Sequence, residues 1–336
     1  MSATVLVTDY AWSDLDIERK ILAESGASLL VAETGDEDEL IELAPCADAI
    51  LTCWQPVTEA VLSAARRCLT VARYGVGLDN IAVDTATELG MIVSNVPAFC
   101  TAEVADHTMA LVLAHARHIT KFAVATSAGQ WDNRSQGPMR RLRGQTFGLV
   151  GYGGIAREVA IRARAFGYDV MAFSPSRAGT PEEDGVRFTA NLTELLRASD
   201  VVSLHLPLTA NTRGIIGRAE LSAMKPRAVL VNTARGALVD QDALIEALEQ
   251  ERLGGAALDV LDGEPPAEGN PLAAMQQVIV TPHAAFDSIE AIAELQETAA
   301  RNVSIVLAGG VPGSIVNPAV LGSPALRVKT RARASS

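Results

Sequence analysis

The stretch TFGLVGYGGIAREVA, at positions 146–160, decides the fold of this chain. Its first five residues, Thr146–Val150, form an apolar strand pattern, and Ile155 and Val159 recur at the spacing of one helix face. A glycine-rich turn joins these two elements, and a second strand pattern, Asp169–Phe173, follows the helix. Strand, glycine turn, helix and strand are the context in which a G-x-G-x-x-G/A sequence binds a dinucleotide.

Each small residue of this turn has a separate physical role. Gly151 permits the tight turn, and Gly153 lets the backbone approach a pyrophosphate closely. Ala156, at the third position, is small enough for the helix to pack on the strand. The N–H groups at the start of the helix, at Gly154 and Ile155, are available to the anion. The sequence therefore predicts a dinucleotide site at Gly151, Gly153, Gly154 and Ile155.

The composition excludes several classes of protein. The 336 residues are 49% apolar and 20% charged, which indicates a globular enzyme of two domains rather than a disordered chain. A net charge of −12 argues against a nucleic-acid partner. No apolar run reaches the length of a membrane span and no signal pattern precedes the first strand, so we expect a cytoplasmic protein that does not bind membranes. The four cysteines lack C-x-x-C spacing, and no metal site is expected.

Strand and helix patterns alternate along both parts of the chain. Such alternation predicts open parallel sheets covered by helices on both faces. A long helical pattern runs from about Thr101 to Ser127, and a last one from about Ser288 to Ala308. We therefore expect an α/β fold of two doubly wound parallel-sheet domains, linked by two long helices, with a cleft between them as the ligand site. The expected strands lie at 4–8, 28–32, 49–52, 70–73, 91–94, 146–150, 169–173, 201–204, 228–232, 255–259 and 278–281.

Four further motifs accompany the glycine turn: RYGVGLDN at 73–80, VNTARG at 231–236, LDVLDGEP at 258–265 and TPHAAF at 281–286. In this order and spacing, they resemble the D-isomer-specific 2-hydroxyacid dehydrogenases, a family that includes phosphoglycerate dehydrogenases, glyoxylate/hydroxypyruvate reductases and the C-terminal-binding-protein corepressors. The resemblance extends from about Val5 to Asn317. It implies two Rossmann-like domains: a flavodoxin-like substrate domain of residues 1–98 plus 290–336, and a dinucleotide-binding domain of residues 99–289. It also implies a homodimer.

The resemblance assigns the catalytic roles to three residues. His283 matches the general acid/base, because a protonated imidazole donates a proton to the carbonyl oxygen as charge forms there. Glu264 matches the carboxylate that favours and orients the imidazolium, and nearby Asp259 and Asp262 are alternative partners. Arg235 matches the arginine whose planar fork binds the substrate carboxylate and polarises the ketone.

Further contacts are implied around these three residues. Asp259 matches the position that contacts the nicotinamide carboxamide, and Thr233 and Ala234 lie beside the cofactor. The backbone N–H groups of Val76 and Gly77 match the loop that holds the other end of the substrate carboxylate, since flanking glycines permit close approach. The expected reaction is hydride transfer between a nicotinamide cofactor and a small 2-oxo or 2-hydroxy acid.

Two departures from the family pattern concern selectivity. NAD-specific relatives carry a carboxylate where this chain has Ser174, so we infer an NADP preference over NAD, with Ser174, Ser176 and Arg177 available to a 2′-phosphate. In the alternative, Ser174 tolerates NADH and Arg177 points to solvent. Phosphoglycerate dehydrogenases place an arginine near Thr52, and its absence here argues against that substrate.

The loop after Thr52 does not decide which side chain the substrate carries. Trp54 or Cys53 would face that side chain and favour an uncharged or aromatic group, while a tryptophan buried in the core is an equal alternative. A competing function is a dinucleotide-sensing regulatory protein like the corepressors, which keep the same three residues. No extension suited to partner binding accompanies them, so we rank regulation below catalysis.

Overall fold

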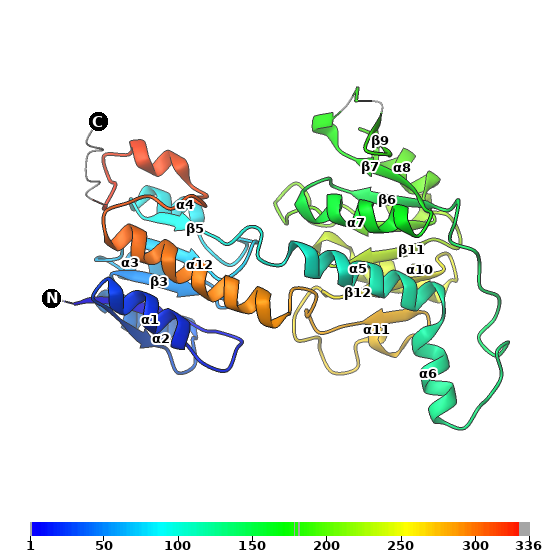
Figure 1. Cartoon of the computed structure of the whole chain (residues 1–336), viewed down its shortest axis with the longest axis horizontal. Coiled ribbons are helices and arrows are strands. Elements are labelled where there is room, and N and C mark those ends of the chain that lie inside the picture. The colour runs from blue at the N-terminus through cyan, green and yellow to red at the C-terminus, as the bar shows by residue number, and fades with distance from the viewer. Residues whose placement is uncertain (1, 178, 181, 329–336) are drawn as a thin grey trace. The chain divides into compact units, whose positions relative to one another are not determined.

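The computed structural model describes residues 2–177, 179, 180 and 182–328 (Figure 1). The chain divides into two compact units: unit 1 comprises Met1–Phe99 and Ser288–Ser336, and unit 2 comprises Cys100–Asp287. These divisions fall one and two residues from the predicted boundaries after residues 98 and 289. The functions assigned to the two units stay predictions.

Unit 1 contains a five-stranded parallel sheet of order β2-β1-β3-β4-β5, the flavodoxin-like order. Apolar side chains of α2, α3 and α4 cover one face, while α1 packs beside α12 against the other (Figure 1). The strands are β1 Ala3–Val7, β2 Ala27–Val31, β3 Ala49–Thr52, β4 Thr70–Arg73 and β5 Ile92–Ser94, and the helices are α1 Asp16–Glu24, α2 Glu37–Leu43, α3 Glu59–Ala64, α4 Val83–Glu88 and α12 Ile289–Leu307.

Unit 2 contains an eight-stranded sheet of order β13-β12-β11-β10-β6-β7-β9-β8, parallel except for the β8–β9 pair. Helices α5 and α7 pack together on one face, and α8, α9 and α10 cover the other. Its strands are β6 Thr146–Val150, β7 Asp169–Phe173, β8 Glu182–Glu183, β9 Val186–Thr189, β10 Val201–Leu204, β11 Val229–Asn232, β12 Gly255–Leu258 and β13 Val278–Val280. Its helices are α5 Thr101–Ala116, α6 Ile119–Ser127, α7 Gly154–Ala165, α8 Leu192–Ala198, α9 Arg218–Ala223, α10 Gln241–Glu249 and α11 Pro271–Ala274.

The strand order of unit 2 reverses between β6 and β10. Chain order runs outward from β6 to β7 and β9 on one side, and from β10 to β13 on the other. In such sheets ligands bind beyond the carboxyl ends of the strands at this reversal. The glycine turn follows β6 at this edge, so the fold places the predicted dinucleotide site where the topology favours one.

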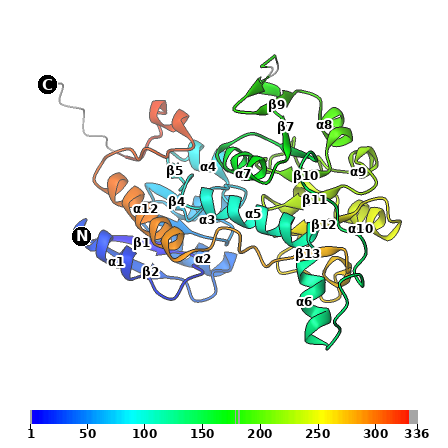
Figure 2. The ribbon, with the colours of Figure 1, turned by 45° about the vertical axis from the view of Figure 1, so that its right-hand side comes forward.

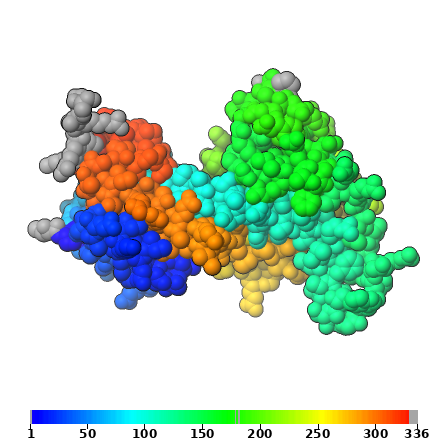
Figure 3. Space-filling model, viewed as in Figure 1, coloured from blue at the N-terminus to red at the C-terminus, as the bar shows by residue number. Residues whose placement is uncertain are grey.

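The fold confirms the α/β class and corrects two details. The helix expected over 101–127 is two helices, because His118 adopts a left-handed backbone conformation with φ of 53° that ends α5 and starts α6. Strands β8 and β9 were not predicted. Helix α6 and the segment after it stand out from the body of unit 2 (Figure 2 and Figure 3). Within the described residues no helix is both long and apolar enough to cross a membrane.

Candidate active site

The glycine turn has the geometry that its sequence predicts. Gly151 has φ of 99°, and a Cβ there would stand 2.7 Å from the carbonyl oxygen of His205, so only glycine fits. A Cβ on Gly153 would meet no protein atom within 4 Å, which leaves space above the backbone for a ligand. Ala156 is fully buried against the sheet, and no side chain caps the amino end of α7. These residues fit a bound pyrophosphate.

Gly153→Ala therefore separates ligand binding from folding. Because the added methyl group meets no protein atom, the thermal midpoint should stay unchanged, while the Kd for the dinucleotide rises by about tenfold or more as the methyl enters the pyrophosphate space. Gly151→Ala is the contrasting variant, since its strained φ and the contact with His205 lower stability as well. Calorimetry and dinucleotide titration measure both quantities. A wild-type Kd in Gly153→Ala would contradict this placement of the pyrophosphate.

The end of β7 carries the predicted 2′-phosphate ligands. Ser174 is nearly buried, and its Oγ lies 3.3 Å from that of Ser176. The Arg177 guanidinium pairs with Glu183 and lies 5.4 Å from the centroid of the Tyr152 ring. Sequence reasoning missed Glu183. The Glu183 side chain is 40% exposed, and ion pairs at such exposed positions contribute little to stability.

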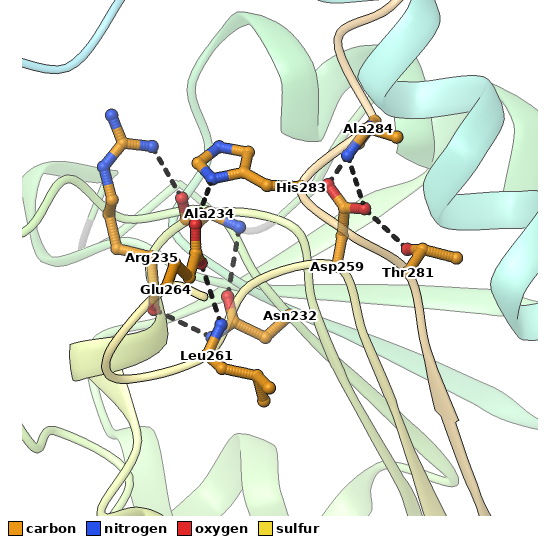
Figure 4. Close-up of polar contacts among 10 residues, drawn as sticks. Asn232, Ala234, Arg235, Asp259, Leu261, Glu264, Thr281, His283 and Ala284 are labelled. Carbon is orange, nitrogen blue, oxygen red and sulfur yellow. Dashed lines mark hydrogen bonds and ion pairs between the residues drawn. The ribbon is translucent and has the colours of Figure 1, made fainter. Parts of the chain in front are cut away.

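Arg235 lies in a loop that is fixed by its neighbours at the end of β11. The Asn232 side chain donates to the Arg235 carbonyl at 2.8 Å and accepts from the Ala234 N–H at 3.0 Å. These two hydrogen bonds fix the conformation of the loop. The Arg235 guanidinium donates to the Ala234 carbonyl at 2.8 Å. A Cβ on Gly236 would stand 1.9 Å from the carbonyl carbon of Leu261, so glycine is required where the loops after β11 and β12 meet. This approach places Arg235 beside the Glu264 segment (Figure 4).

His283 and Glu264 form a close pair. The imidazole Nδ1 lies 2.6 Å from Glu264 Oε2, and Glu264 Oε1 accepts from the Leu261 N–H at 2.9 Å (Figure 4). Burial raises the pKa of Glu264, but the hydrogen bonds from His283 and Leu261 and the positive charges of His283 and Arg235 outweigh it, so the pKa lies below its ordinary value. Glu264 is therefore ionised at neutral pH. Among the alternatives left open by the sequence, the structure gives the Nδ1 contact to Glu264 rather than to Asp259 or Asp262.

Asp259, at the end of β12, is buried and binds the backbone of the His283 loop, a contact that the sequence did not predict. Its side chain is only 1% exposed, and its two oxygens accept from the backbone N–H groups of Ala284 and Ala285, each at 2.9 Å. Its carbonyl accepts from the His283 N–H at 2.8 Å. Asp259 thus holds the backbone of the His283 loop, and a contact with a nicotinamide carboxamide stays a prediction.

The remaining predicted residues occupy unit 2 and unit 1. Thr233 is buried, and its hydroxyl lies 2.9 Å from that of Thr108. In unit 1, Val76 is 39% exposed, and its carbonyl accepts from the Asn95 amide at 2.7 Å. Gly77 follows it in the same loop, so the substrate contacts assigned to both residues stay predictions.

Trp54 is 41% exposed rather than buried in the core. Asp9 holds its loop by accepting from the backbone N–H groups of Cys53 and Trp54, at 2.9 and 2.7 Å. The Arg73 guanidinium carbon lies 5.9 Å from the centroid of the Trp54 ring. The sequence predicted neither the Asp9 contacts nor the Arg73 contact, because Asp9 follows β1 and Arg73 ends β4, both far from Trp54 along the chain.

Comparison with known proteins identifies the family. Residues 109–285 match the model of the D-isomer specific 2-hydroxyacid dehydrogenase NAD-binding domain. A D-3-phosphoglycerate dehydrogenase from Methanocaldococcus jannaschii is 38% identical over 93% of this chain, which spans 59% of that protein's length. A glyoxylate reductase from Aeropyrum pernix is 40% identical over 84% of this chain and 87% of its own.

A solved structure shows the same fold and the same class of enzyme. The NADPH-dependent glyoxylate/hydroxypyruvate reductase from Sinorhizobium meliloti, in complex with NADP and malonate, matches with a TM-score of 0.84 and 27% identity, covering 99% of this chain and all of that one. The chain belongs to the family of D-isomer specific 2-hydroxyacid dehydrogenases. It is an NAD(P)-dependent oxidoreductase that transfers a hydride between its cofactor and a 2-oxo or 2-hydroxy acid.

Proposed function

We propose that this enzyme reduces small 2-oxo acids without a phosphate group, with glyoxylate, hydroxypyruvate or a bulkier analogue as substrate, and that Arg235, Glu264 and His283 carry the reaction. The observation that supports this most strongly is the 2.6 Å contact between His283 Nδ1 and an ionised Glu264, in a segment that packs against the Arg235 loop. An acid, its orienting carboxylate and a carboxylate-binding arginine are groups that promote reduction of a 2-oxo acid by a hydride donor.

The proposed mechanism gives one step to each residue. The Arg235 fork binds the substrate carboxylate and polarises the C2 carbonyl. When bound, the reduced nicotinamide supplies the hydride that adds to C2. Because Glu264 holds the Nδ1 side of the ring, His283 donates its proton from Nε2 to the carbonyl oxygen, which completes the 2-hydroxy acid. Glu264 stabilises the imidazolium until this transfer.

Other proposed contacts complete the site. Thr233, Ala234 and Asp259 would contact the cofactor, and the N–H groups of Val76 and Gly77 would bind the far side of the substrate carboxylate. Trp54 would contact the substrate's side chain, which its exposure permits. We propose a homodimer packed through unit 2, supported by the exposed apolar side chains of Val124 and Trp131, and a cytoplasmic location.

Initial rates against a panel of 2-oxo acids, with NADPH and with NADH, test the proposal. We expect turnover of unphosphorylated 2-oxo acids and a preference for NADPH. Turnover confined to a phosphorylated acid would overturn the substrate assignment. Tight cofactor binding without turnover of any acid would favour the competing function, a dinucleotide-sensing regulatory protein.

The NADPH preference has its own test in Ser174→Asp. A carboxylate at the end of β7 repels a 2′-phosphate and accepts from ribose hydroxyls, so the ratio of kcat/KM for NADPH to that for NADH should fall by about 100-fold. Ser222→Asp adds the same charge on the exposed face of α9 and should leave the ratio unchanged. An unaltered ratio in Ser174→Asp would exclude Ser174 from the selectivity site.

A further inference from the structure

We propose that Thr281 and His107 are positioning residues for His283, to which they are linked through the buried carboxylate of Asp259. The inference rests on the proposed role of His283. Thr281 Oγ1 lies 2.5 Å from Asp259 Oδ1 and 3.0 Å from His107 Nε2, and His107 Nε2 lies 3.5 Å from the same Asp259 oxygen. Helix α5 thereby supports the loop that follows β13, across 174 positions of sequence.

The hydrogen bonds that connect His107, Thr281 and Asp259 can have only one order of donors and acceptors. Asp259 accepts from two backbone N–H groups, and its carboxylate acts as an acceptor towards Thr281 as well. Thr281 has one hydroxyl hydrogen, which it donates to Asp259, so its oxygen must accept from His107. His107 therefore carries a hydrogen on Nε2. The order is His107 Nε2–H to Thr281 Oγ1–H to Asp259 Oδ1.

This chain of hydrogen bonds controls the backbone of the proposed acid. Asp259 contacts three consecutive N–H groups, those of His283, Ala284 and Ala285. His283 itself has φ of 53°, a left-handed conformation that is strained for a non-glycine residue and persists only when neighbours enforce it. Thr281 and His107 fix the carboxylate that enforces it (Figure 4 draws Thr281, Asp259, Ala284 and His283). Loss of the hydroxyl would let the loop shift and move the ring relative to Glu264.

Thr281→Val removes the hydroxyl at nearly constant shape. We expect kcat to fall by about 10- to 100-fold, the effect of a small misplacement of a catalytic group, while KM for the 2-oxo acid changes by less than about threefold. Thr281→Ser restores the hydroxyl and should restore kcat. Thr70→Val is the matched control. It removes the hydrogen bond that the buried Thr70 hydroxyl of β4 donates to the Ile92 carbonyl of β5, in unit 1, and should leave kcat unchanged.

His107 offers a second pair of variants. His107→Gln keeps an N–H that reaches Thr281 and should retain most of kcat, whereas His107→Leu lacks the donor and should resemble Thr281→Val. In the ligand-free enzyme, nitrogen-15 NMR of the histidine rings should show an Nε2-bound hydrogen on His107, protected from exchange in the wild type and not in Thr281→Val.

The outcomes separate this inference from the proposed function. A wild-type kcat in Thr281→Val, equal losses in Thr281→Ser and Thr281→Val, or a His107 ring with its hydrogen on Nδ1 alone would each overturn the positioning role. If His283→Ala retains full activity, the proposed function fails first. If His283→Ala loses activity while Thr281→Val does not, only the positioning role fails.

Discussion

His283→Ala should lower kcat for 2-oxo acid reduction by about 10²- to 10⁴-fold, the usual contribution of a positioned general acid. Cofactor affinity should change little, because the predicted dinucleotide contacts lie mainly at the glycine turn after β6. His118→Asn is the matched control: it replaces a histidine that also has a positive φ, at the junction of α5 and α6, and it should retain activity. Single-turnover rates measure the chemical step directly. An active His283→Ala enzyme would exclude this ring as the acid.

Glu264→Gln extends the same prediction to pH. The pKa of Glu264 lies below its ordinary value, so its carboxylate is ionised throughout the neutral range and accepts from the His283 ring. In the wild type, kcat/KM for reduction should fall as the pH drops through this lowered pKa, because the protonated carboxyl loses its charge. Glu264→Gln should have a lower kcat/KM and should lack this acidic limb. A wild-type rate with an unaltered acidic limb in the variant would show that the 2.6 Å contact has no part in proton transfer.

Arg235→Lys is expected to have the second large effect. Lysine keeps the charge but loses the planar fork, so kcat/KM for the 2-oxo acid should fall by about 10²- to 10³-fold, comparable to the loss of one transition-state donor. Arg218→Lys replaces an exposed arginine of α9, paired with Glu246, and should leave kcat/KM unchanged. Full rescue of Arg235→Lys at high substrate concentration would assign Arg235 to binding alone. An unchanged kcat/KM would remove it from the site.

The sequence predicted the features that depend on local pattern. Strands β1 to β7 and β10 to β13, the glycine turn and the motif containing Arg235 each lie within a few consecutive residues, where periodicity and residue type are informative. The break at His118 was missed because the apolar pattern continues through it, although the backbone turns left-handed there. Strand β8 has two residues and no periodicity to detect.

The missed parts of the site depend on contacts between distant segments. Glu183, which pairs with Arg177, lies in β8, a short strand that was not predicted. His107 is one of several histidines in its region, and only the packing of α5 places it on Thr281, far along the chain. Nothing in local spacing distinguishes it from His115, whose burial lowers its pKa to about 4 and keeps the ring neutral.

We propose that Arg235, Glu264 and His283 together promote hydride addition from the reduced nicotinamide to C2 of a 2-oxo acid and protonate its oxygen. NADPH oxidation by the full chain with hydroxypyruvate, followed by chiral analysis of the product, tests this mechanism directly in the wild type and in His283→Ala. We expect rapid oxidation that forms the D-isomer of the 2-hydroxy acid, and loss of that oxidation in the variant. An L-product, or equal rates in the two proteins, would contradict it.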